Sequence, residues 1–270
     1  MEKSTVVGII LGFGALIVGM IFKGANPVSI LQNPAAIIII LVGTAASISI
    51  GFPGSELKKI PKLFSILFKK QKLLAKTEII RLFMDWASIT RREGLLALES
   101  KVEEIDDAFL RNGMRMIIDG NDQDFVRDVL LEEIHAIEDR HKSGALIFTQ
   151  AGTYAPTLGV LGAVIGLVAA LGNLSDMEVL AHSIAGAFIA TLLGIFTGYV
   201  LWHPFANKLK QLSRKEVEMK MMMIEGLLSI QSGVSTIAIS QKLSVFLTPT
   251  ERAQESKREA GEDGEKVQTA

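Results

Sequence analysis

The stretch QAGTYAPTLGVLGAVIGLVAAL, residues 150–171, decides the fold of this chain. It contains no Asp, Glu, Lys or Arg, and it is long enough to hold the roughly 20 residues that cross a hydrocarbon core of about 30 Å as a helix. It belongs to an uncharged run at 143–175, and further uncharged runs occupy 4–22, 24–55 and 179–207. We therefore expect an all-α polytopic membrane protein with four transmembrane helices.

Turn residues and charges set the expected boundaries of these helices. Asn33-Pro34 is typical of a helix start with proline in the first turn. The predicted segments are transmembrane helices at about 4–22 and 34–51 within 1–52, a cytoplasmic helical domain at 53–144, transmembrane helices at about 146–172 and 181–202 within 145–204, a cytoplasmic helical tail at 205–248 and a disordered tail at 249–270.

The positive charges are segregated, with sixteen of the 28 Lys and Arg residues between 53 and 142 and ten between 208 and 266. Positive charge marks the cytoplasmic side of a membrane protein. We therefore expect a multi-pass protein of the cytoplasmic membrane with both termini in the cytoplasm.

The segments outside the membrane have helical periodicity and predict no β-sheet. Apolar residues recur every three or four positions over 77–142, which is divided into stretches of about 77–92, 95–118 and 122–142. Residues 58–72 interleave lysines with apolar residues, which suits either a helix lying on membrane lipid or an ordinary cytoplasmic flank. From residue 250 the sequence is too polar to bury a core, which predicts disorder.

Small residues recur at every fourth position of the last two predicted spans. Such spacing lets helices approach closely in lipid, where packing drives association. It is compatible with packing inside one subunit or with assembly around a central element, and we favour assembly. The rows are Ala151, Ala155, Gly159 and Ala163; Gly162, Gly166 and Ala170; and Gly186, Ala190, Gly194 and Gly198.

The predicted spans contain two informative prolines, hydroxyl groups, and no carboxylate. Pro156 removes a backbone hydrogen bond, so a static kink or a hinge is expected there, and Pro204 lies at the end of the last span. His182 is near the outer end of that span and suits an interfacial position better than a proton relay. A transporter normally keeps an ionisable group in the membrane, so we expect a partner to supply the ion-binding carboxylate.

Four stretches together resemble the flagellar stator branch of the MotA/TolQ/ExbB proton channel superfamily, of the Gram-positive type. They are 150–171, quoted above, ATLLGIFTGYVLWHPFANKL at 190–209, RREGLLALE at 91–99 and DDAFLRNG at 106–113. The resemblance covers about 1–248 and implies a stator subunit that assembles as a ring, five copies around two copies of MotB. MotB is a single-span protein whose membrane Asp binds the ion. Ion flow, of protons rather than sodium, would then drive rotation and torque on the rotor protein FliG.

The resemblance also implies roles for individual residues. Arg91 and Glu99 match a pair that faces charged residues of FliG, although the adjoining Arg92 is an alternative for the first. They are eight residues apart, so on one helix they would share a face. The residues matched to the ion path and its conformational change are Pro156, Pro204, Thr191, Ala163 and Tyr199.

Other functions fit less well. An ExbB- or TolQ-like energiser of an outer-membrane linking system shares the ring but has three spans, and a sodium-driven stator shares the whole framework. A solute carrier is disfavoured because no internal repeat or broken helix pair is visible. No nucleophile–base set or phosphate loop suggests an enzyme, and we expect no cofactor, metal or nucleic acid. The absence of cysteine excludes disulfides and thiolate metal sites.

Overall fold

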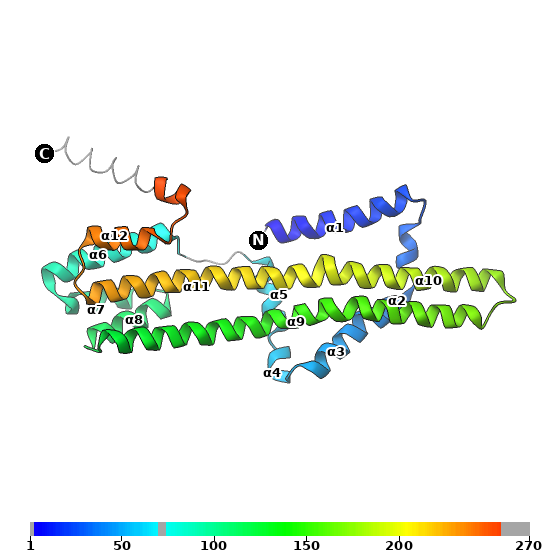
Figure 1. The fold of residues 1–270 in the computed structure, drawn as a ribbon, viewed down its shortest axis with the longest axis horizontal. Helices are drawn as coiled ribbons and strands as arrows, with labels where there is room; N and C mark the ends of the chain where they lie inside the picture. Colours follow the sequence, from blue (N-terminus) through cyan, green and yellow to red (C-terminus); the bar gives the residue numbers. More distant parts are fainter. Residues whose placement is uncertain (1–2, 70–73, 255–270) are drawn as a thin grey trace. The chain divides into compact units, whose positions relative to one another are not determined.

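The computed structural model describes residues 3–69 and 74–254, and helices are the only regular secondary structure in that part of the chain. In chain order the elements are α1 (Lys3–Phe22), the 3₁₀ turn η1 (Pro27–Ile30), α2 (Pro34–Ile37), the π-helical turn η2 (Ile38–Val42), α3 (Gly43–Gly51), α4 (Gly54–Leu57), α5 (Ile60–Phe68), α6 (Lys76–Glu93), the 3₁₀ turn η3 (Leu95–Leu98), α7 (Glu99–Glu103), α8 (Ala108–Ile118), α9 (Gln123–Leu171), α10 (Met177–Phe196), the π-helical turn η4 (Thr197–Trp202), α11 (His203–Gln231) and α12 (Thr236–Ser244). Figure 1 shows their course.

Of the described residues, 3–69 and 139–212 form one compact unit, here called the span unit, and 74–138 and 213–254 form a second, called the helical unit. Four helices in the described residues are long and apolar enough to cross a membrane. They are Lys3–Phe22, Pro34–Gly51, Gln123–Leu171 and Met177–Gln231, the last two extending beyond a membrane-spanning window.

The caps explain where the apolar helices begin. Asn33 accepts a hydrogen bond from the backbone N–H of Ala36 and Pro34 follows it in the first turn, as the sequence predicted. Asp176 accepts from the N–H groups of Glu178 and Val179, so α10 begins four residues before the predicted start of its span. The sequence analysis missed this cap.

The segment after the second span packs within the span unit. The ring of Phe64 on α5 meets that of Phe148 on α9 edge to face at 5.1 Å, and Leu67 is fully buried. On α4, Glu56 accepts hydrogen bonds from Lys59 (2.5 Å) and from Ser143 of α9 (3.0 Å). Residues 54–68 therefore group with the spans rather than with the rest of the predicted 53–144 domain, because their apolar face is buried against protein.

The helical unit has its own apolar core. Phe83 and Trp86 of α6 are buried together, with ring centroids 5.5 Å apart. A Cβ on Gly226 of α11 would lie 2.4 Å from the Phe83 ring, so only glycine admits this packing. Met222 and Met223 are buried beside it, which makes the methionine-rich stretch of α11 a core face.

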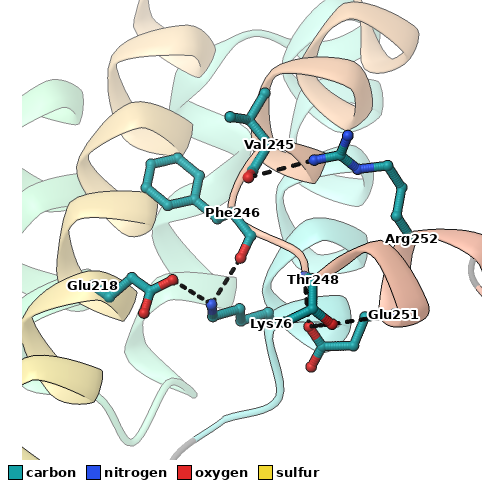
Figure 2. A network of polar contacts seen from close by, with 7 residues as sticks. All are labelled: Lys76, Glu218, Val245, Phe246, Thr248, Glu251 and Arg252. Carbon is teal, nitrogen blue, oxygen red and sulfur yellow. Dashed lines mark hydrogen bonds and ion pairs between the residues drawn. The ribbon is translucent and has the colours of Figure 1, made fainter. Parts of the chain in front are cut away.

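A polar network joins three segments of the helical unit (Figure 2). Lys76 at the start of α6 donates to the Glu218 carboxylate (2.6 Å) and to the backbone carbonyl of Phe246 (2.7 Å). Arg252 donates to the carbonyl of Val245 at 3.5 Å. One lysine therefore links α6, α11 and the segment after α12.

Two predictions about this unit were wrong. Residues 95–118 form η3, α7 and α8 rather than one stretch, because Asp107 caps a new helix by accepting from the N–H of Leu110. Residues 249–254, predicted to be disordered, are helical. Thr248 and Glu251 form a reciprocal cap: the Glu251 carboxylate accepts from the N–H of Thr248 (2.8 Å), and the Thr248 hydroxyl accepts from the N–H of Glu251 (3.3 Å). The predicted disorder of 255–270 lies outside the described residues.

Candidate functional site

The rows of small residues form a seam between α9 and α10, which run antiparallel (Figure 1). A Cβ on Gly159 would lie 2.8 Å from the carbonyl oxygen of Ala190 and 3.0 Å from Cα of Gly194. A Cβ on Gly194 would lie 2.7 Å from the carbonyl oxygen of Ala155. The two backbones therefore touch, and no side chain fits between them. At this crossing the small residues serve packing inside one subunit, which was the alternative to the assembly that the sequence analysis favoured.

Pro156 lies where this seam meets the π-helical turn η4. Proline has no N–H, so the carbonyl of Gly152, four residues earlier, loses its α-helical partner. A Cβ on Gly198 would lie 2.7 Å from Cγ of Pro156 and 2.9 Å from the oxygen of Gly152. The freed carbonyl and the proline ring are thus both covered by the bare Cα of Gly198, an approach that suits a weak Cα–H···O contact.

Pro204 explains the widened turn before it. In a regular α-helix its ring would clash with the carbonyl of Val200. Instead the N–H of His203 bonds to the carbonyl of Gly198, five residues earlier, which is the π-helical pattern. Single π-helical turns of this kind are frequent at functional sites. The two candidate prolines are therefore joined through Gly198, which packs on the first and anchors the turn required by the second.

His203 is a member of this junction that the sequence analysis missed. A Cβ on Gly152 would lie 2.8 Å from the imidazole ring, so the ring covers that glycine. The ring of Tyr199 lies 5.3 Å away between centroids, and Tyr199 is 65% exposed. The sequence signals for this position are a glycine four residues before Pro156 and a histidine directly before Pro204.

Five threonine hydroxyls of the last two spans are bonded to their own helices, which is a common state of threonine in membrane helices. The donors and acceptors are Thr149 to Ala145 O (3.1 Å), Thr153 to Thr149 O (3.1 Å), Thr157 to Thr153 O (3.1 Å), Thr191 to Ala187 O (3.3 Å) and Thr197 to Leu193 O (2.8 Å). Since each hydroxyl proton is used, these groups present acceptor oxygens to any visiting ion or partner.

Two further candidates flank the seam. Ala163 lies one turn beyond Gly159 on α9, and Thr191 follows Ala190 on α10; both are half-buried. None of the four apolar spans contains an Asp, Glu, Lys or Arg side chain within 4–22, 34–51, 146–171 or 181–202. These four stretches thus offer close backbone packing and acceptor oxygens, but no carboxylate to hold an ion.

Arg91 and Glu99 are exposed, but they do not share a helix face as predicted. Gly94 has φ +85°, a conformation that ends α6, so Arg91 lies in the last turn of α6 and Glu99 begins α7 after η3. Within the described residues neither side chain makes a hydrogen bond or ion pair, whereas Arg92 donates to the carbonyl of Ser88 at 3.3 Å.

Comparison with known proteins gives concordant results over almost the whole chain. The MotA/TolQ/ExbB proton channel family matches residues 101–222. Motility protein A of Bacillus subtilis (strain 168) is 54% identical over 266 residues, which are 98% of each protein.

Two solved structures share the fold. The flagellar MotAB stator complex from Bacillus subtilis contains a chain with a TM-score of 0.89 and 55% identity, and the match covers 94% of this chain and 99% of that one. The C. jejuni MotAB structure gives a TM-score of 0.87 and 31% identity, covering 92% and 97%. Similarity at these levels extends through both units.

Proposed function

The chain belongs to the MotA/TolQ/ExbB proton channel family, and from this premise we propose that it is the membrane-embedded subunit of a flagellar stator. With a MotB-type partner it forms an ion channel that converts ion flow into rotation and torque on the rotor. Its similarity to Motility protein A and to two MotAB structures supports this function over an ExbB- or TolQ-like energiser.

The observation that carries the proposal is the missing carboxylate. A channel that steps with each ion needs a group whose charge changes when the ion binds, and a charge is costly in the bilayer centre. The spans of this chain have no such group, but they have the Pro156–Gly198–Pro204 junction, where two helix irregularities meet. The carboxylate then comes from the partner's single span, and this junction adjusts as it is neutralised.

The stator is a multi-pass protein of the inner membrane with both termini in the cytoplasm, in agreement with the positive charge between and after the spans. We assign it the ring of five subunits around two MotB-type chains that the family resemblance implies. The path beside the partner's Asp is lined by Thr191, Ala163 and Tyr199.

Torque passes to FliG through Arg91 and Glu99. Both are exposed and have no polar contact within the described residues, so a rotor can engage them without breaking contacts inside the chain. Arg92, which bonds to its own helix, is the weaker candidate. Exposed charge pairs contribute about 0.2–1 kcal/mol each, which suits a contact that forms and breaks with every step.

The transported ion is the proton, in line with the family's description, and sodium is the alternative. One elementary charge crossing 100 mV supplies roughly 2.3 kcal/mol, so each step must involve a small rearrangement or use the full ion-motive force.

The test uses a bacterium that lacks its own stators. The chain is expressed with and without a MotB-type partner, and tethered flagella are watched while the proton and sodium gradients are collapsed separately. Rotation that needs the partner and stops only with the proton gradient is expected. Loss with the sodium gradient alone would change the ion, and no rotation despite insertion with a matched partner and rotor would favour the energiser.

A further inference from the structure

A crevice of about 430 Å³ lies inside the span unit, between α1 and the η4–α11 segment. Two contacts bound it. At one end a Cβ on Gly12 would lie 2.6 Å from Cγ1 of Val200, and at the other the Lys208 ammonium donates to the Ser4 hydroxyl (3.1 Å) and to that of Thr5. Between them nothing lies within 4 Å of where a Cβ on Gly8 would be. The helices are therefore joined at two places with a gap between.

The gap has one polar end and one apolar length. Lys208, Ser4 and Thr5 line the polar end, and Thr5 is fixed there because its hydroxyl donates to the carbonyl of Leu67 at 2.9 Å. Gly8, Ile9 and Val200 line the remainder. A ligand that fills the gap must have a polar head and an apolar body.

Charge at the polar end favours an anionic head. Lys208 contributes a cationic side chain, Lys3 is in the first turn of α1, and Lys69 follows Leu67 by two residues. The N-terminus of α1 adds the positive end of its helix dipole. By the positive-inside rule this end faces the cytoplasmic leaflet, where anionic lipids are concentrated.

The apolar length indicates a lipid rather than a soluble phosphate. The crevice is lined by Gly8 and Ile9 of α1, and the next two residues of that helix, Ile10 (64% exposed) and Leu11 (66% exposed), are exposed apolar side chains. A surface of this kind belongs in hydrocarbon. A free phosphate would occupy the lysine end and leave the gap beside Gly8 empty. We infer that the crevice binds an anionic phospholipid of the cytoplasmic leaflet, with its phosphate at Lys208 and an acyl chain beside Gly8.

Tyr199 and Pro204 also line this crevice. The lipid therefore contacts the π-helical turn directly and braces α1 against it. The binding site itself is independent of the stator function, since lipid retention is measured without rotation.

The experiment measures phospholipid retained by the purified complex of the full chain with its partner subunit, by native mass spectrometry. The complex is delipidated and supplied with phosphatidylglycerol, phosphatidylcholine or inorganic phosphate. Lys208→Gln is expected to lower phosphatidylglycerol retention about fivefold, the effect of one lysine near a lipid surface. Lys210→Gln, an exposed lysine of the same helix, should retain it normally.

A second pair of variants keeps the charge and changes the space. Gly8→Leu should exclude the acyl chain and lower retention, whereas Gly14→Leu, which also enters open space on another face of α1, should not. Equal retention of phosphatidylcholine, equal protection by inorganic phosphate, or unchanged retention in both Lys208→Gln and Gly8→Leu would overturn the assignment. So would an assembled complex in which a neighbouring copy of the chain fills the crevice.

Discussion

At the scale of single residues, glycines decide how the candidate site is built. At position 198, glycine is the only residue type that fits against both the Pro156 ring and the freed carbonyl of Gly152. The sequence analysis singled out both prolines and the spacing of the small residues. It did not predict that Gly198 lies between the two prolines. That relation depends on how two helices are aligned across a seam, which spacing along one helix does not determine.

Gly198→Ala tests this junction. The added methyl would meet Pro156 Cγ at 2.7 Å and Gly152 O at 2.9 Å, so overpacking should cost about 1–3 kcal/mol. We expect a lower thermal unfolding midpoint for the purified complex, together with impaired rotation. Gly14→Ala is the control, because nothing lies within 4 Å of its added methyl. Equal midpoints in the two variants would show that the junction tolerates the side chain.

Pro156→Ala separates the proline's two roles. Alanine restores an N–H for the Gly152 carbonyl but removes the ring that packs on Gly198. We expect rotation to stop while the MotB-type partner still co-purifies, measured by tethered-cell rotation and by pull-down. Normal swimming would remove this proline from the mechanism.

Charge reversal at Arg91 or Glu99 addresses the rotor contact. Because exposed pairs are individually weak, Arg91→Glu or Glu99→Lys should slow rotation, and the double variant should slow it further. Membrane insertion and partner binding should be unchanged. Asp128→Lys, an exposed acid on α9, is the control for a charge change elsewhere. Failure of insertion in the Arg91 or Glu99 variants would make these residues structural.

At the scale of elements, the sequence predicted long apolar helices well and short boundaries poorly. The spans contain enough apolar residues to be unambiguous. Gly94, Asp107 and the TPTE stretch at 248–251 each set a boundary through one dihedral angle or one cap, which periodicity does not register. The TPTE stretch was readable as a capping box, and its polar surroundings led to a wrong prediction of disorder for 249–254.

The cap at Thr248 gives a prediction about pH. Hydrogen bonds from the backbone N–H and the hydroxyl of Thr248 hold the pKa of Glu251 below its usual value. Because the pKa is lower in the folded chain, the Glu251 carboxylate stabilises this turn fully at pH values above the ordinary glutamate pKa of about 4.3. That stabilisation is lost as the pH falls through the folded pKa. Amide protection factors over 250–254 should therefore drop in acidic solution below that value.

Glu251→Gln is the matched variant for this cap. A neutral amide should weaken protection at pH 7 and remove its acid dependence. Glu104→Gln, an exposed carboxylate at the end of α7, should alter neither. Protection in the wild-type chain that stays constant through the acid range would show that the carboxylate does not hold this turn.

At the scale of the whole molecule, segregated charge and uncharged spans were sufficient to predict four membrane helices, helical extramembrane parts and the need for a partner. The comparisons confirm the family and the all-α membrane fold. The division into units was not predictable, because residues 54–68 read as cytoplasmic by charge and yet pack on α9 through Phe64 and Leu67. The α1 crevice was likewise invisible in the sequence, since it depends on two contacts from segments about 200 residues apart.

The glycine seam has a mechanical consequence. Where α9 and α10 meet backbone to backbone at Gly159 and Gly194, there are no side chains whose rotamers could change to absorb displacement. This part of the α9–α10 pair should therefore move as one rigid body. Flexibility is then confined to the proline-bearing end of the helix pair and to its contacts with neighbouring subunits. The free energy released by each ion should therefore produce movement at those places rather than bending of the helix pair.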